Sequence, residues 1–311
     1  MTSSLIVAFD VGGTQIKAAA IVDGTIVEAT VGHYESKADL ATGPLMDSFV
    51  DIFADILAKS GSHDAVDGLG VAFPGPFDYE TGVSRIQGLG KFDSLYGLPV
   101  GRLLLQSLRA DERTSKRLAP HFRIAFENDA ALFGLGEAGP GGAAEGAARA
   151  VCLTIGTGLG SCYLEHGRLV KKRDNVPADG WLYSVPYRDG IADDYVSRRG
   201  VLQLAARLGL DAERLDVREL ASLADAGNRD AIRLFEQFGR QMADILIPEL
   251  LRFQPDRIVI GGQISKSAHL FVPAFRGAAE LARLHAEVRV SRDTLSSTLL
   301  GVYGLMKGPV G

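Results

Sequence analysis

The stretch that decides the fold reads Leu5-Ile-Val-Ala-Phe-Asp10-Val-Gly12-Gly13-Thr14-Gln-Ile-Lys17. An apolar run, residues 5–9, leads into the carboxylate Asp10, and a glycine turn follows. Apolar alternation then resumes from Ile16 to Val22, and Asp23-Gly24 is typical of a type I′ hairpin turn. The glycines therefore stand between two strands. The two commonest nucleotide-binding glycine motifs stand instead between a strand and a helix.

Asp10 and the glycines beside it have two interpretations. Backbone N–H groups in a glycine turn can point at a phosphate, because the absence of Cβ atoms allows close approach. A carboxylate at the end of a buried strand is costly unless it is paired or bound to a metal ion. A tight turn in which the aspartate caps its own backbone explains the same residues equally well. This stretch alone leaves both interpretations open.

Composition limits the class of protein. The chain has 311 residues, 46% of them hydrophobic, which is enough for two domains. A net charge of −5 offers no basic surface for a nucleic acid. We find no signal peptide and no membrane-spanning run, so we expect a cytoplasmic protein without a membrane partner. The two cysteines, Cys152 and Cys162, lie in predicted strands and are expected to be reduced.

Periodicity predicts the remaining elements. A helical stripe covers residues 43–59, and an apolar strand over 66–73 runs into Pro74-Gly75-Pro76, an irregular loop that is either a ligand loop or a plain turn. Further strands are predicted over 122–126, 257–260 and 288–290, and further helices over 100–109, 111–118, 130–137, 230–253 and 299–306.

The tripeptide Glu127-Asn128-Asp129 follows a short strand and precedes a helix. Either Asn128 or Asp129 suits the N-cap of that helix, which is a sufficient structural reason for both. Asp129 also suits a general base, because the helix macrodipole favours an ionised carboxylate at this end. The segment by itself favours the cap.

The opening pattern recurs near the middle of the chain. An apolar run, residues 151–155, precedes the turn Gly156-Thr157-Gly158-Leu-Gly160, and alternation resumes afterwards. Aligning Thr154 with Asp10 places Gly156 on Gly12. Two strand–turn–strand units predict a duplicated domain, with two phosphate loops facing each other across a cleft. Gly261-Gly262, after a strand, is either an ordinary turn or a close approach to a planar base.

The chain resembles the ROK (repressor, open reading frame, kinase) family of sugar kinases over almost its whole length. Five motifs carry the resemblance: DVGGTQIK (Asp10 to Lys17), GVAFPGP (Gly70 to Pro76), ENDA (Glu127 to Ala130), TIGTGLGS (Thr154 to Ser161) and IVIGGQIS (Ile258 to Ser265). The resemblance implies an α/β, actin-like ATPase (ribonuclease H-like) fold. We expect a smaller N-terminal domain, residues 1–120 completed by 298–311, and a larger one, 121–297. We also expect a homodimer.

Site residues follow from the resemblance, position by position. The first phosphate loop is Asp10, Gly12, Gly13 and Thr14, with Lys17 beside it, and Asp10 acts through the Mg²⁺ of MgATP. The second is Gly156, Thr157, Gly158 and Gly160, and Gly261-Gly262 is the adenosine contact. Gly75, Asn128 and Asp129 bind the acceptor sugar, with Asp129 as general base. The expected reaction is transfer of the γ-phosphate of ATP to a sugar hydroxyl.

Three segments depart from the family pattern. Residues 187–197 contain no cysteine where the family carries a zinc motif, so no structural zinc is expected. Asp193 falls on the family's sugar-binding glutamate, Trp181 on its histidine and Ala178 on a second glutamate. Gly88-Leu-Gly-Lys-Phe92 replaces the family's Asn-Leu-Gly-Trp. Substrate recognition therefore differs, with Trp181 and Asp193 expected to contact the acceptor and glucose expected to be a poor one.

Two other functions compete with a hexose kinase. One is a kinase for an N-acetylated amino sugar or a polyol, and the other is a catalytically silent sugar sensor, against which Asp10, Asp129 and both glycine turns argue. A repressor of the same family would carry an N-terminal winged helix-turn-helix. The first glycine turn begins too close to Met1 to leave room for that domain, so no nucleic-acid partner is expected.

Overall fold

The computed structural model describes residues 4–308, which fold as two compact units. Unit 1 runs to Gly136 and is joined by the chain from Leu295 onward, and unit 2 is Glu137–Thr294. The boundary between the units thus lies after residue 136, whereas the sequence predicted it after residue 120. The two differ because strand β8 (Leu118–Glu127) belongs to the sheet of unit 1. Residues 309–311 of the predicted segment 298–311 lie outside the described residues.

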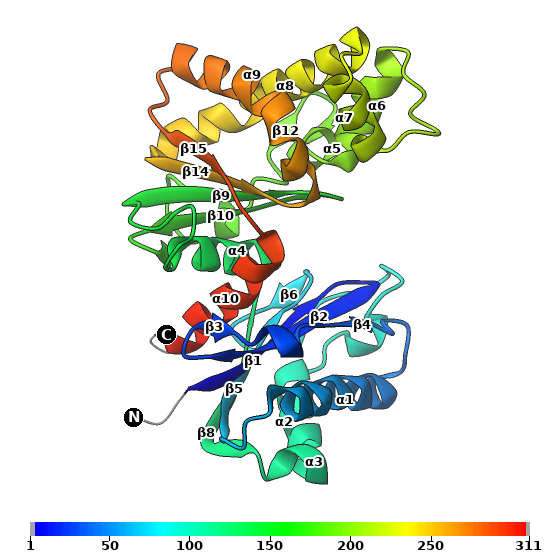
Figure 1. Cartoon of the computed structure of the whole chain (residues 1–311), viewed down its shortest axis with the longest axis vertical. Coiled ribbons are helices and arrows are strands. Elements are labelled where there is room, and N and C mark those ends of the chain that lie inside the picture. The colour runs from blue at the N-terminus through cyan, green and yellow to red at the C-terminus, as the bar shows by residue number, and fades with distance from the viewer. Residues whose placement is uncertain (1–3, 309–311) are drawn as a thin grey trace. The chain divides into compact units, whose positions relative to one another are not determined.

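Unit 1 is built on a mixed sheet with the order β3-β2-β1-β5-β8 (Figure 1), with β4 also pairing β2. Strand β1 is antiparallel to β2 and parallel to β5, and β5 is parallel to β8. The remaining bounds are β1 Leu5–Val11, β2 Gln15–Val22, β3 Thr25–Ile26, β4 Gly32–Glu35 and β5 Val66–Ala72, with the small hairpin β6 Phe77–Asp78 and β7 Val83–Ser84 beside it.

Strand β1 is buried on both faces. Leu5, Val7 and Phe9 belong to one apolar cluster with residues of α1 (Thr42–Ser60) and α2 (Val100–Ala110). The alternate residues of β1 join α10 (Thr294–Lys307) in another cluster. Gly68 and Gly70 in β5 let α10 approach, since a Cβ at either position would overlap the side chains of that helix. The C-terminal helix is therefore part of the core of unit 1.

Unit 2 repeats the plan with a sheet of order β11-β10-β9-β14-β15. Its bounds are β9 Arg149–Ile155, β10 Leu159–Glu165, β11 Arg168–Leu169, β14 Arg257–Gly261 and β15 Glu287–Val290. The last pair before the turn is Val11 with Ile16 in unit 1 and Ile155 with Leu159 in unit 2, so Thr154 occupies the register position of Asp10. The predicted duplication is confirmed strand by strand.

Helices pack on the sheet of unit 2 to form its core. The long helix α8 (Arg229–Phe253) and α9 (Ala268–Leu281) contribute buried Phe235, Phe238 and Phe271. The smaller elements are α5 Ala192–Tyr195, α6 Arg198–Arg207, α7 Val217–Asp225 and the hairpin β12 Pro186–Tyr187 with β13 Gly190–Ile191. Cys152 and Cys162 face each other across β9 and β10 as buried free thiols, in agreement with the prediction.

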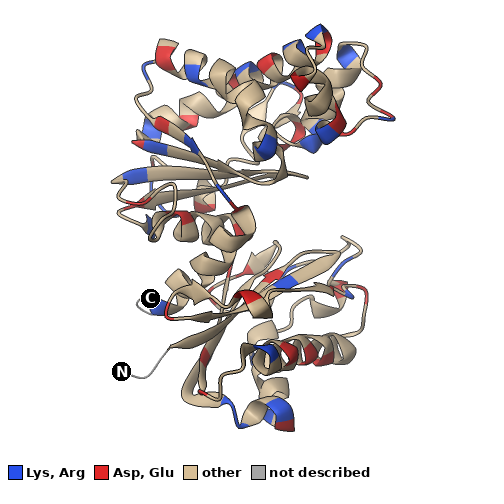
Figure 2. Ribbon diagram, viewed as in Figure 1, with Lys and Arg blue, Asp and Glu red and all other residues tan. Residues whose placement is uncertain are grey.

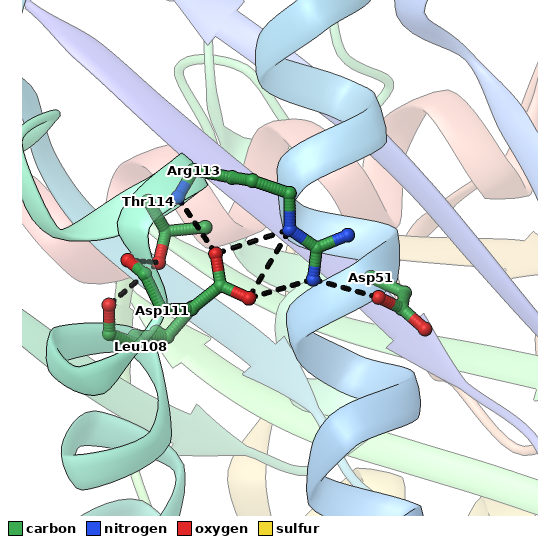
Figure 3. A network of polar contacts seen from close by, with 5 residues as sticks. All are labelled: Asp51, Leu108, Asp111, Arg113 and Thr114. Carbon is green, nitrogen blue, oxygen red and sulfur yellow. Dashed lines mark hydrogen bonds and ion pairs between the residues drawn. The ribbon is translucent and has the colours of Figure 1, made fainter.

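The charged segment predicted as a helix over 111–118 forms only the short helix α3 (Glu112–Ser115), because β8 already begins at Leu118. Asp111 caps α3 by accepting from the Arg113 N–H, and the Arg113 guanidinium bridges Asp111 to Asp51 of α1 (Figure 3). Acidic residues recur along α1 (Figure 2): Asp47 and Asp51 are exposed, whereas Asp55 accepts from the hydroxyl of Tyr34 in β4. Over residues 4–308, no helix is long and apolar enough to cross a membrane.

Candidate active site

The first glycine turn, residues 12–15, closes with a hydrogen bond from the Gly12 N–H to the carbonyl of Gln15, at 2.8 Å. A Cβ at Gly12 would stand only 2.9 Å from that same oxygen, so the turn requires glycine here. Ser36, after β4, holds the turn by donating from its Oγ to the Gly13 carbonyl and from its N–H to the Thr14 carbonyl. Thr14 stands exposed at the tip of the turn.

Asp10 lies directly before this turn and opposite Lys17 in the register of β1 and β2. Its Oδ2 is 3.5 Å from the Lys17 Nζ, a loose ion pair. Burial raises the pKa of Asp10, and Lys17 opposes that rise. The carboxylate is therefore only partly compensated by the protein, as expected of a group with a further cationic partner.

The register of the strands brings Asn128 and Asp129 close to Asp10. Asp10 pairs with Ala72 of β5, which pairs with Glu127 of β8, and the chain then enters α4 (Asp129–Ala138). Asn128 caps this helix, its Oδ1 accepting from the Ala130 N–H at 3.0 Å. The sequence allowed either Asn128 or Asp129 as the N-cap of this helix. In the structure Asn128 is the N-cap, and Asp129 is the first residue of the helix.

Asp129 keeps accessible surface, but protein atoms surround it closely enough to desolvate its carboxyl group in part. That desolvation raises the pKa of Asp129, and the negative charge of Asp10 raises it further. The Ala130 N–H and the Asn128 side chain act in the opposite direction. A carboxylate with a raised pKa beside a second carboxylate is a typical arrangement for a proton acceptor.

Lys91 is a residue that the sequence analysis did not assign to the site. Its side chain lies over the first turn, since a Cβ at Gly13 would stand 2.9 Å from the Lys91 Cδ and 3.6 Å from its Nζ. Asp93 shapes the loop by accepting the N–H groups of Leu89 and Gly90, and Phe92 anchors it in the core. The sequence signal for this role was the lysine in Gly88-Leu-Gly-Lys-Phe92. The sequence analysis interpreted that stretch only as a departure from the family pattern.

Gly75 lies in the loop after β5, at the same edge of the sheet as Asp129. The loop is held there because the Phe73 N–H donates to the carbonyl of Glu127 and the Tyr79 hydroxyl donates to the carbonyl of Phe73. Unit 1 thus brings together Asp10, Lys17, the first glycine turn, Gly75, Asn128 and Asp129.

The second glycine turn, residues 156–158, is shorter by one residue than the first and closes through the Gly156 N–H and the Gly158 carbonyl, at 3.0 Å. Thr157 is exposed at its tip, as Thr14 is in the first turn, and Gly160 lies in β10 opposite Thr154. A Cβ at Gly158 would stand 2.7 Å from the Asp193 Oδ1, so a side chain at this position would displace Asp193.

Gly261-Gly262 lies beside the second turn, because Gly261 pairs with Thr154 and the Gln263 N–H borders Gly156. Gly262 has φ +89°, and a Cβ there would overlap the backbone of Ile155. Its N–H donates to the Thr294 hydroxyl at 2.8 Å. The close approach at Gly262 is thus to the backbone of Ile155 within unit 2, and the contact of this pair of glycines with a planar base stays a prediction.

Trp181 and Asp193, predicted as sugar contacts, belong to unit 2. The half-buried Trp181 packs against Tyr183, with ring centroids 5.8 Å apart, and Tyr183 is 40% exposed. Asp193 is engaged by its own unit: Oδ1 accepts the Leu159 N–H and Oδ2 pairs with Arg199. Among residues 4–308, no cluster of three or more His, Cys, Asp or Glu is placed to hold a metal ion.

Two sheets of the same strand order, each with a glycine turn between its first two strands, form the actin-like ATPase fold, and the predicted fold class is confirmed. The sequence profile of the ROK family matches residues 106–290, more than half of the chain. The chain belongs to the ROK family.

Individual relatives agree with this assignment. The glucokinase of Thermotoga maritima is 25% identical over 87% of this chain and 86% of its own length. The N-acetyl-D-glucosamine kinase of Photobacterium profundum is 26% identical over 85% of each chain. A crystal structure of a ROK family glucokinase from Streptomyces griseus, in complex with glucose and AMPPNP, matches 97% of this chain and 99% of that one, with a TM-score of 0.70 and 20% identity.

Proposed function

We propose that this protein is a sugar kinase that transfers the γ-phosphoryl group of ATP to a hydroxyl group of a hexose or related sugar. The observation that carries the proposal is the placement of Asp129 beside Asp10 and next to the first glycine turn, with the pKa of each carboxyl group raised by its surroundings. Relatives named as sugar kinases support a sugar acceptor, and the AMPPNP bound to the Streptomyces griseus enzyme supports ATP as donor.

The two glycine turns are proposed to bind the phosphates through backbone N–H groups: Gly12, Gly13 and Thr14 in the first turn, and Gly156, Thr157, Gly158 and Gly160 in and after the second. Lys17 and Lys91 would add positive charge beside the first turn. Gly261-Gly262, where glycine allows the backbone to approach a planar base, is proposed to contact adenosine. Electrostatic stabilisation of this kind is the main contribution of a protein to phosphoryl transfer.

Asp10 fits a Mg²⁺ ion that arrives with ATP. Mg²⁺ in such sites is held by one or two carboxylates together with substrate phosphates and water. Asp10 supplies one partly compensated carboxylate next to the proposed phosphate turn. When bound, Mg²⁺ would neutralise phosphate charge. Because phosphate oxygens and water complete the coordination of Mg²⁺, the protein does not need to supply a full set of ligands.

Asp129 is proposed to accept the proton of the sugar hydroxyl as the hydroxyl oxygen attacks the γ-phosphorus. A new oxygen–phosphorus bond forms, the bond between the γ-phosphorus and the bridging oxygen breaks, and ADP leaves with that electron pair. A carboxylate whose pKa is raised is a better proton acceptor than an ordinary aspartate. Asn128 and Gly75 are proposed to position the acceptor beside it.

The acceptor is proposed to meet an apolar wall at Trp181 and Tyr183, whose rings form an accessible tilted pair. An aromatic wall discriminates weakly, whereas a pocket that hydrogen-bonds a given hydroxyl rejects analogues strongly. Ala178 and Trp181 replace two hydrogen-bonding residues of the family pattern, so fewer groups are left to bind the hydroxyls of glucose. We therefore expect glucose to be a poorer substrate than a sugar with an apolar substituent, such as an N-acetylated hexosamine. Trp181→His is expected to shift the preference among hexoses. A glucose kcat/KM above roughly 10⁵ M⁻¹s⁻¹, in the ordinary range for a good substrate, would contradict this proposal.

The test of the proposed function is ADP production from ATP with a panel of hexoses, N-acetylated hexosamines and polyols, with mass spectrometry of the phosphorylated product. Asp129→Asn is expected to lower kcat by at least ~10²-fold, as is usual when a general base is lost. ATP affinity is expected to stay within a few-fold of the parent. Sugar binding without any phosphorylated product would instead identify a silent sensor.

A further inference from the structure

Asp193 is attached to the second glycine turn by a direct hydrogen bond. Its Oδ1 accepts the N–H of Leu159, the residue that follows the turn, at 2.7 Å, although the two residues are 34 positions apart in the sequence. The same oxygen would be only 2.7 Å from a Cβ at residue 158, so the carboxylate packs closely against Gly158. The contact therefore holds both the Leu159 N–H group and the neighbouring turn residue Gly158 in position.

The second oxygen of Asp193 is also occupied within unit 2. Its Oδ2 is 3.0 Å from an NH2 group of Arg199, and the same guanidinium pairs with Asp194 at 2.8 Å. The side chain of Asp193 is 25% exposed and that of Arg199 is 54% exposed, so the pair is shielded from water on the Asp193 side only. Arg199 thus favours the rotamer in which Oδ1 reaches Leu159.

The opposite end of the turn is held by the same segment of chain. The backbone N–H of Arg198, the first residue of α6, donates to the carbonyl of Gly156 at 2.8 Å. Residues 193–198 therefore hold the turn at both ends, one contact from a side chain and one from the backbone.

We infer that Asp193 is a positioning residue for the second phosphate turn and that it acts on ATP binding, with Arg199 orienting it. This inference rests on the proposed function, in which residues 156–158 bind phosphate. It is an alternative to the expected role of Asp193 as a sugar contact, because both oxygens of its carboxylate already have partners within unit 2. A turn held ready in its binding geometry does not have to be ordered when the nucleotide arrives.

The experiment compares Asp193→Ala, Asp193→Asn and Asp194→Ala with the parent. Asp193→Ala removes the acceptor for the Leu159 N–H, and we expect the KM and the Kd for ATP to rise about 10-fold, the order expected for one charge-assisted hydrogen bond. Asp193→Asn keeps an acceptor oxygen and is expected to recover most of the affinity. Asp194→Ala is the matched control: it removes a carboxylate from Arg199 without touching the turn, and its ATP affinity should match the parent.

The two Michaelis constants separate the alternatives. If Asp193→Ala raises the KM of the sugar and leaves ATP binding unchanged, Asp193 grips the acceptor and the inference is wrong. Thermal unfolding of each variant shows whether the fold is retained. If Asp193→Ala does not fold, Asp193→Ser takes its place, because the shorter side chain also removes the carboxylate oxygen that accepts the Leu159 N–H, and the same outcomes apply.

Hydrogen exchange distinguishes failure of this inference from failure of the proposed function. The Leu159 amide is expected to exchange at least ~10-fold faster in Asp193→Ala than in the parent, whether or not the protein phosphorylates a sugar, because exchange reports local opening. Unchanged exchange at Leu159 overturns the positioning role. Faster exchange together with unchanged affinity for ATP supports the tether but removes the second turn from the nucleotide site.

Discussion

Asp129 combines a proposed catalytic role with a cost in stability. Its pKa is raised by partial desolvation and by the charge of Asp10, so its ionised form is less favourable in the folded protein than in the unfolded chain. Asn128, and not Asp129, holds the helix cap, so the charge can be removed without removing the cap.

We predict that Asp129→Asn makes the protein more stable at pH 7. For a carboxyl group with a raised folded-state pKa, stability falls as pH rises from the ordinary value of 3.8 through the raised value. The gain from Asp129→Asn should therefore shrink as pH falls and vanish below pH 3.8, where the group is protonated in both states. Denaturant unfolding across a pH series measures it.

The control for this prediction is Asp47→Asn, on the exposed face of α1. This substitution should change the unfolding free energy by no more than ~0.5 kcal/mol, both at pH 7 and below pH 3.8. If Asp129→Asn is less stable than the parent at pH 7, its charge is favourable in the native state and the raised pKa is wrong.

Lys91 is a second residue whose role comes from its placement over Gly13. We predict that Lys91→Ala lowers kcat/KM for ATP by about 10-fold, because one cation is lost beside the phosphate turn. Lys91→Arg should keep more than half of the activity. Lys116→Ala, at an exposed position after α3, is the control of equal charge change. Equal effects of Lys91→Ala and Lys116→Ala would show that only net charge matters.

At the scale of elements, α4 and α10 cross in unit 1 through two glycines. A Cβ at Gly136 of α4 would stand 1.8 Å from the carbonyl oxygen of Ser297, and a Cβ at Gly301 of α10 would stand 1.8 Å from that of Leu132. The obstruction on each side is helix backbone, which cannot move aside as a side chain can. The crossing therefore depends on glycine at both positions.

We predict that Gly301→Ala destabilises the protein by about 3 kcal/mol, at the upper end of ordinary overpacking costs. Gly277→Ala is the matched control, since Gly277 lies on the exposed face of α9 with no atom within 4 Å of an added Cβ. That substitution should stabilise by ~0.5–1 kcal/mol, the helix-propensity difference. Equal Tm values for the two variants would mean that the helices separate at little cost.

At the scale of the whole molecule, the segment where the family pattern carries cysteines is held by other contacts. The Tyr195 hydroxyl donates to Asp189, and the ring of Tyr195 meets that of Tyr187 edge-on, with centroids 5.0 Å apart. Asp194 accepts the Ile191 N–H and so closes the hairpin onto α5. These contacts link β12, β13 and α5 without a metal ligand.

We predict that the purified protein contains no stoichiometric zinc and that EDTA leaves its Tm within about 1 °C, because structural zinc requires four Cys or His ligands in one place. EDTA should still abolish ATP turnover until excess Mg²⁺ is restored. Elemental analysis and thermal unfolding with and without chelator provide the measurements, and about one zinc per chain would reveal a metal site elsewhere. Homodimer formation and cytoplasmic location also stay predictions.

Local patterns in the sequence predicted most strands of the two large sheets, both glycine turns, the duplication and a helix over 130–137. They did so because alternation, glycine turns and helix periodicity depend on neighbours a few residues apart. The motifs around Asp10, Asn128 and Thr154 also identified the family. The predicted zinc-free segment and the departures at Trp181 and Asp193 came from the same comparison of local patterns.

Only the tertiary structure decided which distant side chains meet. It placed Lys91 over Gly13 and Asp193 on Leu159, and it moved the boundary between the units to residue 136. These contacts join segments far apart in the chain, and their formation depends on packing and loop closure rather than on local preference. For that reason Asp193 could be named from its sequence position, but its partner could not.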